Sequence, residues 1–262
     1  MPFFDRNGWQ MYYEIHGTGP ETIVAIHENI ASTRWWQFLL PFLPSGCRIV
    51  MMDLRGCGKS THTRDGYEIS QYVQDIHELL AGLDGGRFHL LGHSMGGQIA
   101  LAYALRYPQD LQTIALVDSV PADGLALDDQ GRQAFRELQQ DKAILRQAVR
   151  GCFPYCTDED VLDELWQGAC YCSSAVYHEN QETMHATRLI DDAGTVEHPV
   201  LILHGREDAV IPLATMVRTV QAMPKARAVF LERCGHSPFI ERPEAAANIY
   251  FGFLHDYGYP VL

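Results

Sequence analysis

The chain has 262 residues, of which 47% are hydrophobic, and its formal net charge is −13. This length and composition predict one large hydrophobic core, because α/β domains of this size commonly form a single unit. The acidic residues are scattered along the chain, which favours a role in solubility and disfavours nucleic acid or an anionic membrane as a partner.

No apolar stretch approaches the length of a transmembrane helix, and the first residues lack the charged and apolar regions of a signal peptide. We therefore expect a soluble cytoplasmic protein with a small-molecule partner and no membrane partner. The seven cysteines are an odd number spread through the chain, which argues against a disulfide framework.

The first half of the chain alternates predicted strands and helices. Residues 10–15 and 22–27, joined by a Gly/Pro turn at 17–20, predict an antiparallel hairpin. Residues 48–53 form an unbroken apolar run that is typical of a buried parallel strand. Apolar residues then recur at helical spacing over 69–83, which predicts an amphipathic helix against the sheet.

A serine flanked by glycines follows the next predicted strand. Gly92-His93-Ser94-Met95-Gly96-Gly97 lies between the apolar run 88–91 and the helix-like segment 98–105. This is the pattern of the Gly-x-Ser-x-Gly nucleophile elbow, in which a sharp turn exposes the serine Oγ. We expect that a Cβ atom at Gly92 or Gly96 would clash with neighbouring backbone. The positive helix N-terminus below Ser94 favours a negative oxygen next to it.

Strand and helix alternation continues to residue 117, which predicts a parallel sheet with right-handed crossovers. It stops between about residues 121 and 197, where segments 128–150, 158–168 and 175–190 are helical in pattern. Ligands of parallel sheets bind at the carboxyl ends of the strands, so we expect the functional residues there.

Candidates for an acid and a base follow two later strands. Asp208 comes after the apolar strand 200–204, and His236 comes after the strand 228–231. An imidazole can take a proton from Ser94 and return it, provided that a carboxylate holds its tautomer. Glu207 and Asp118 are alternative carboxylates for this task. His93 is interpreted as structural, because the site needs one base.

At these residues the chain resembles the α/β-hydrolase family, in the order Ser, Asp, His. Residues 53–60 resemble the family segment Asp-x-x-Gly-x-Gly-x-Ser, and residues 237–243 resemble the stretch after its catalytic histidine. The family spacing Gly-x-x-Asp from Gly205 favours Asp208 as the acid, with Asp118 as the fallback seen in some members. The resemblance implies an α/β-hydrolase fold, with a mostly parallel central sheet flanked by helices. Residues 1–120 and 194–262 would form its core, and 121–193 a helical cap or lid.

The resemblance also implies an oxyanion hole. After the strand 22–26, where the family usually has His-Gly, this chain has His27-Glu28-Asn29-Ile30. Asn29 falls at the oxyanion position, and Met95 after the nucleophile would supply the second N–H. A carboxylate aimed at a developing oxyanion opposes catalysis, so we expect Glu28 to point away or to meet a polar group of the substrate. A serine nucleophile disfavours haloalkane dehalogenase and epoxide hydrolase.

A cap excludes water and shapes the pocket, so substrate choice is expected to depend on its aromatic and apolar residues and on the two tryptophans after the oxyanion loop. For any single cap residue the alternative is that it only joins cap to core. The candidate pocket residues are Glu28, Trp35, Trp36, Phe153, Tyr155, Trp166, Tyr177 and Met184.

Four cysteines, Cys152, Cys156, Cys170 and Cys172, gather in one segment. Their spacings match zinc knuckles poorly, so we expect buried small hydrophobic side chains there and no metal.

The sequence as a whole predicts a serine hydrolase that needs no cofactor and acts on a small or medium carboxylic ester or lactone. The same triad would also serve a thioester or the carbon–carbon bond of a vinylogous diketone. An aromatic cap favours an aromatic or polyketide-like substrate. A ligand receptor that keeps the fold without turnover is the alternative from another class.

Overall fold

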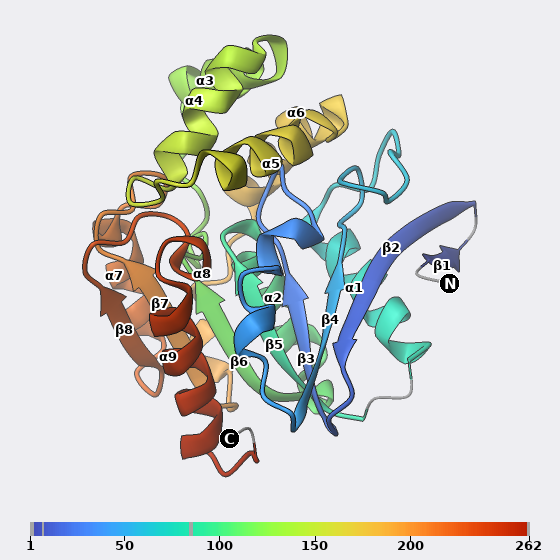
Figure 1. Cartoon of the computed structure of the whole chain (residues 1–262), viewed down its shortest axis with the longest axis vertical. Helices are drawn as coiled ribbons and strands as arrows, with labels where there is room; N and C mark the ends of the chain where they lie inside the picture. Colours follow the sequence, from blue (N-terminus) through green and yellow to red (C-terminus); the bar gives the residue numbers. More distant parts are fainter. Residues whose placement is uncertain (1–2, 7, 84–85, 261–262) are drawn as a thin grey trace.

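One eight-stranded sheet with helices on both faces organises the chain in the computed structural model (Figure 1), which describes residues 3–6, 8–83 and 86–260. The strand order is β1-β2-β4-β3-β5-β6-β7-β8. The strands β1 and β2 run antiparallel to their neighbours, and β3 to β8 are parallel. The α/β-hydrolase architecture predicted from the sequence is therefore confirmed. The strands are β1 (Phe3–Arg6), β2 (Trp9–Gly17), β3 (Glu21–Ile26), β4 (Cys47–Met52), β5 (Phe88–His93), β6 (Leu111–Val117), β7 (Val200–Gly205) and β8 (Arg227–Leu231).

The predicted hairpin between residues 10–15 and 22–27 is wrong. Strand β2 pairs antiparallel with β4, with Ile15 opposite Val50, and β3 lies on the other side of β4. The Gly/Pro turn carries the chain across the end of β4, because the N–H groups of Gly19 and Glu21 donate to the carbonyls of Cys47 and Gly46, both at 3.1 Å. A turn sequence fixes the local bend but not the strand that inserts beside it.

Apolar side chains fill both faces of the sheet, as is usual for buried parallel strands. Helices α1 (Ile69–Ala81), α2 (Met95–Arg106) and α7 (Leu213–Ala222) cover one face, where Tyr72 and Ile76 are fully buried. Helices α8 (Pro238–Glu241) and α9 (Pro243–Asp256) cover the other, where Tyr250 and Phe253 are fully buried. The predicted helix over 69–83 is confirmed as α1, two residues shorter.

Four helices lie between β6 and β7, above the carboxyl ends of the strands (Figure 1). Aspartates accept N–H groups at the start of the first three, as capping residues do. The helices pack together through a small hydrophobic cluster of Leu145, Ala169 and Tyr177. The helices are α3 (Asp129–Gln140), α4 (Lys142–Cys152), α5 (Glu159–Cys170) and α6 (Ser174–Ala186), and the 3-10 turns of the chain span Thr33–Trp36, Leu40–Phe42, Pro108–Asp110 and Ala193–Thr195.

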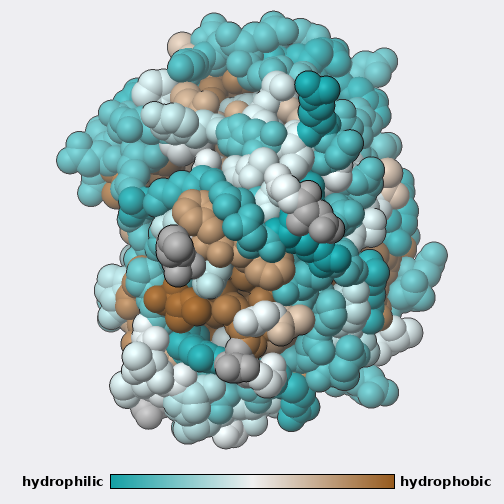
Figure 2. Space-filling model, turned by 90° about the vertical axis from the view of Figure 1, so that its right-hand side faces the viewer, coloured by the Kyte–Doolittle hydropathy of each residue, from teal (hydrophilic) through white to brown (hydrophobic). Residues whose placement is uncertain are grey.

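The outer surface is mostly hydrophilic on the side that carries β1 and β2, with a hydrophobic area between polar regions (Figure 2). Phe3 on β1 and Ile15 on β2 are 38% and 46% exposed. Within the described residues, every helix is too short or too polar to cross a membrane.

Candidate active site

Ser94 lies at the bend between β5 and α2, with φ +53° and ψ −115°. This backbone conformation is strained for a residue with a side chain. It is held because Ser94 N–H donates to the carbonyl of Val117 at 2.9 Å. A Cβ at Gly92 would collide with the carbonyl of Gly96, and a Cβ at Gly96 would meet the carbonyls of β3 and His27. The predicted requirement for glycine at both positions is confirmed.

Asp208 and His236 meet at the same edge of the sheet, one after β7 and one after β8. Nδ1 of His236 donates to Oδ2 of Asp208 at 2.7 Å, and both residues are almost fully buried. Oδ1 of Asp208 accepts the N–H groups of Val210 and Ile211 at 2.8 and 2.9 Å. The backbone N–H groups of its own turn therefore hold the Asp208 carboxylate in place, and the carboxylate in turn orients the imidazole of His236.

The two alternative carboxylates have other partners. Asp118 is fully buried, with Oδ1 accepting the N–H of Gly205 at 2.8 Å and lying 3.3 Å from Nδ1 of His204. Glu207 accepts the N–H of Cys234 at 3.1 Å. Within the described part of the chain, neither hydrogen bonds to His236.

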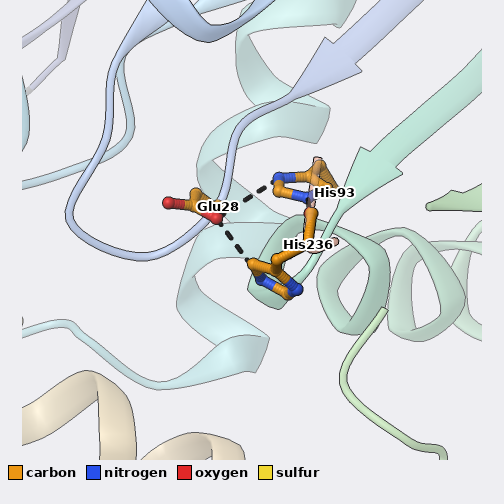
Figure 3. Close-up of side chains that lie close together, drawn as sticks. All are labelled: Glu28, His93 and His236. Carbon is orange, nitrogen blue, oxygen red and sulfur yellow. Dashed lines mark hydrogen bonds and ion pairs between the residues drawn. The ribbon is translucent and has the colours of Figure 1, made fainter. Parts of the chain in front are cut away.

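Glu28 points into the site. Its Oε2 atom lies 3.4 Å from Nε2 of His236 and 3.5 Å from Nδ1 of His93, between the two rings (Figure 3). Of the two expectations for Glu28, that it points away is wrong, and that it meets a polar group of the substrate stays a prediction. His27 explains the direction of the loop, because its Nδ1 donates to the carbonyl of Glu28 at 2.6 Å while its Nε2 accepts the N–H of Leu54 at 2.9 Å.

His93, which sequence reasoning set aside as structural, connects these groups. Its Nε2 donates to the carbonyl of His236 at 2.5 Å, so it ties β5 to the loop of the base. Trp35 stacks on its ring at 5.7 Å with an interplanar angle of 25°, and Trp36 meets it edge-on at 6.5 Å. Its place beside Ser94 in the elbow was the only signal in the sequence for this contact.

The site shifts the pKa values of its ionisable groups. Burial lowers the pKa of His236, but the charge and hydrogen bond of Asp208, followed by the charge of Glu28, outweigh it and raise the pKa to about 9. Burial raises the pKa of Glu28 to about 8. For Asp208, burial acts upward but the charge of His236 and its hydrogen bond lower the pKa. Burial and the nearby Asp208 raise the pKa of Asp118.

The two predicted oxyanion residues lie in the loop after β3 and at the start of α2. Oδ1 of Asn29 accepts from Nδ2 of Asn180 on α6 at 2.8 Å, and Oδ1 of Asn180 accepts from the hydroxyl of Tyr72 at 2.8 Å. The loop is thus anchored to the helices above it. Met95 is the first residue of α2, where backbone N–H groups have no acceptor within the helix.

The candidate pocket residues divide into two groups. Trp35, Trp36 and Phe153 gather with Glu28 around His93, and the rings of Trp35 and Phe153 lie 5.2 Å apart. The other four lie in helices α5 and α6 or in the loop before α5. Trp166 donates to the carbonyl of Lys142, Tyr177 donates to that of Ala169, Met184 is buried in the core, and Tyr155 is 39% exposed.

Two groups of side chains place potential metal ligands within 4.8 Å of one another among the described residues: Glu28 with His93 and His236, and Asp118 with His204 and Asp208. The cysteines are free thiols, and the four in segment 152–172 are only partly buried, so the expectation that they are buried is wrong.

Residues 19–243 match the model of the alpha/beta hydrolase fold, so the chain belongs to the α/β-hydrolase family and is a hydrolase by class. Among curated relatives, a monoacylglycerol lipase of Homo sapiens is 27% identical, over 96% of this chain and 81% of that protein. A 2-hydroxy-6-oxononadienedioate/2-hydroxy-6-oxononatrienedioate hydrolase of Paraburkholderia xenovorans is 26% identical, over 94% and 90%. The crystal structure of a bromoperoxidase from Bacillus anthracis superposes with a TM-score of 0.88 at 27% identity, over 95% and 96% of the two chains.

Proposed function

We propose that the chain is a serine hydrolase that cleaves a small or medium carboxylic ester or lactone through an acyl-enzyme on Ser94. The hydrogen bond of 2.7 Å between His236 and Asp208, at the sheet edge where the strained Ser94 turn also lies, carries the proposal. It leaves Nε2 of His236 as the nitrogen that can accept a proton, which is the arrangement that a general base requires.

The reaction follows from these positions. Ser94 Oγ attacks the carbonyl carbon while Nε2 of His236 takes its proton, and Asp208 stabilises the imidazolium. The N–H groups of Asn29 and Met95 donate to the oxyanion of the tetrahedral intermediate. His236 then gives its proton to the leaving alcohol, and water releases the acid from Ser94 by the same steps.

Glu28 sets the resting state of this cycle. When Glu28 is ionised, its Oε2 atom, 3.4 Å from Nε2, favours the imidazolium form of His236, which cannot act as a base. Among the described residues, Ser94 Oγ makes no hydrogen bond, so the serine does not hold Nε2 in the resting chain. Ser94 can therefore attack the substrate only after Nε2 of His236 has lost its proton.

The cap at residues 121–193 and the aromatic residues near His93 are proposed to form the pocket. Trp35 supports this, because its buried Nε1–H has no acceptor among the described residues and could donate to a polar group of a substrate. An aromatic substrate could pack against the neighbouring rings of Phe153 and Trp35. A cytoplasmic location completes the proposal and stays a prediction from the sequence.

Cleavage of a carbon–carbon bond is the second candidate, and Glu28 is the observation that favours it. Such a reaction needs a proton for the carbon that leaves, in addition to the proton that His236 handles. Glu28 is a buried carboxyl whose burial raises its pKa to about 8, so it can hold a proton at neutral pH. The relative from Paraburkholderia xenovorans carries the name of such a hydrolase.

A fluorophosphonate probe tests the proposal. We expect one adduct by intact mass, located on Ser94 by peptide mapping, and none on Ser94→Ala. Folded protein that stays unlabelled would favour a ligand receptor on the same fold.

A panel of p-nitrophenyl esters, lactones, thioesters and vinylogous diketones then separates the reaction classes. Turnover of esters or lactones at least tenfold above the other substrates supports the first proposal. A preference for the diketones supports carbon–carbon cleavage.

A further inference from the structure

Three hydrogen-bond acceptors face one another at the centre of the site. Nδ1 of His236 donates to Asp208, so a neutral ring carries its lone pair on Nε2. Nε2 of His93 bonds to a carbonyl oxygen, which can only accept, so a neutral His93 carries its lone pair on Nδ1. Both of these nitrogens lie within 3.5 Å of the Oε2 atom of Glu28 (Figure 3). The arrangement therefore requires a proton or a cation.

The spacing of the three atoms suits a metal ion. Oε2 lies 3.4 Å from one ring nitrogen and 3.5 Å from the other, and all three atoms lie within 4.8 Å. In a tetrahedral zinc site with bonds of about 2.0–2.2 Å, neighbouring ligand atoms lie about 3.4 Å apart. Two imidazoles and one carboxylate are a ligand set that zinc uses where it keeps one position open.

His93 gives independent support. Its Nδ1 atom is buried and has no hydrogen-bond partner among the described residues, and the residue is only 1% exposed. A buried polar atom without a partner costs about 1–3 kcal/mol, so such an atom calls for an explanation. A metal ion between His93 and Glu28 would satisfy it.

The surroundings also orient both rings as they are oriented in metal sites. Metal-binding histidines usually donate their second ring N–H to a carboxylate or a backbone carbonyl. His236 donates to the carboxylate of Asp208, and His93 donates to the carbonyl of His236. Stacking on Trp35 fixes the plane of His93. The pair of rings is thus held in place without a contribution from the metal.

We infer that Glu28, His93 and His236 form a binding site for a divalent transition-metal ion, with Zn²⁺ as the best fit, and that the bound ion inhibits the enzyme. The ion takes the lone pair of Nε2 of His236, which is the pair that accepts the proton of Ser94 in the proposed function. The inhibitory part rests on that proposed function, whereas the binding part does not. The chemistry of the free enzyme needs no metal.

Binding is tested with the full chain after treatment with a chelator. Equilibrium dialysis against Zn²⁺ is expected to show one tightly bound ion, and Glu28→Gln should weaken its affinity at least about tenfold, since even partners outside the ligand shell cost that much. Asp118→Asn is the matched control for the other cluster and should leave the affinity unchanged. His93→Gln is a second variant and should also weaken binding at least about tenfold.

Co²⁺ absorption separates this site from the free cysteines. A four-coordinate ion bound by nitrogen and oxygen gives visible bands without the near-ultraviolet charge-transfer band of a thiolate ligand, and these bands should be lost in Glu28→Gln. A thiolate band, or equal binding to the parent chain and Glu28→Gln, overturns the inference. If no metal binds, a shared proton lies between the three acceptors, and the inference is likewise overturned.

Inhibition is measured on any ester that the enzyme turns over. Turnover should fall with Zn²⁺ at the concentration that half-fills the site, recover with chelator, and resist Zn²⁺ in Glu28→Gln. If Ser94 is unreactive but the ion binds as described, the proposed function fails and the metal site stands. If esters are cleaved and Zn²⁺ does not lower their turnover, the proposed function stands and the inhibitory part of the inference fails.

Discussion

Oε2 of Glu28 lies 3.4 Å from Nε2 of His236, on the side of the ring opposite the Asp208 carboxylate. The imidazole therefore sits between two carboxyl groups, and the serine must compete with one of them for the same nitrogen. This relationship distinguishes the site from one in which a glycine follows the histidine of the oxyanion loop.

Replacing the serine should remove turnover and leave the fold intact. Ser94→Ala deletes the attacking oxygen, so kcat/KM for an ester should fall about 10⁴-fold or more. The thermal unfolding midpoint should not fall, because the substitution removes no contact that stabilises the elbow. Among the described residues, Ser94 Oγ has no hydrogen bond to lose. If the variant kept turnover near that of the parent chain, the nucleophile would be a residue other than Ser94.

Asp208→Asn should lower kcat about 10⁴-fold, because an amide no longer favours the tautomer with the proton on Nδ1 of His236. Glu207→Gln is the matched control, since that carboxylate binds a backbone N–H of Cys234. Steady-state kinetics on one ester measures both. If Asp118→Asn produced the loss and Asp208→Asn did not, the acid role would pass to Asp118.

Glu28→Gln should move the pH dependence of kcat/KM. The base works only when His236 is neutral, so the rate of the parent enzyme rises with pH through the pKa of His236, about 9. Removing a neighbouring carboxylate favours the neutral ring, so this rise should occur about one pH unit lower. The profiles are measured with chelator present to exclude bound metal. An unchanged profile contradicts an interaction between the two groups.

Gly96→Ala should destabilise the chain by about 3 kcal/mol, because the new methyl group meets backbone carbonyls of Ile26 and His27 that cannot move aside. Gly252 in α9 provides the comparison. A Cβ there meets nothing within 4 Å, so Gly252→Ala should stabilise the helix by about 0.5–1 kcal/mol. Urea unfolding of the two variants measures these opposite effects, and equal values for both would refute the steric argument.

Asn180→Ala should lower kcat/KM about tenfold by releasing the side chain of Asn29 and so loosening the oxyanion loop. Tyr72→Phe is the control, because it removes only the hydroxyl that donates to Asn180 and keeps the contact with Asn29. The control is expected to lose stability and to retain turnover. Equal loss of turnover in both variants would assign the effect to general loosening of the helices.

The sequence predicts the elbow well because its constraints are local. Gly92, Ser94 and Gly96 lie within five residues, and the contacts that exclude a Cβ atom arise within the same bend or from the adjacent strand. Asp208 and His236 lie at the predicted edge because they follow two neighbouring parallel strands, β7 and β8.

Other features depend on distant residues and were not predictable in the same way. The neighbour of β2 is decided by β4, which is more than 30 residues further along the chain. The direction of Glu28 depends on His93 and His236, which come from two other elements. A pattern in the sequence around residue 28 contains neither of these contacts.

Ile30 follows this loop with φ +58°, a conformation that branched residues rarely adopt. Holding it there costs on the order of 1–2 kcal/mol, which the rest of the chain must offset. A residue with a strained backbone thus lies beside Asn29, which we propose to bind the oxyanion. Glycine at position 30 would relieve this backbone strain but would also remove the contacts of the Ile30 side chain with the core.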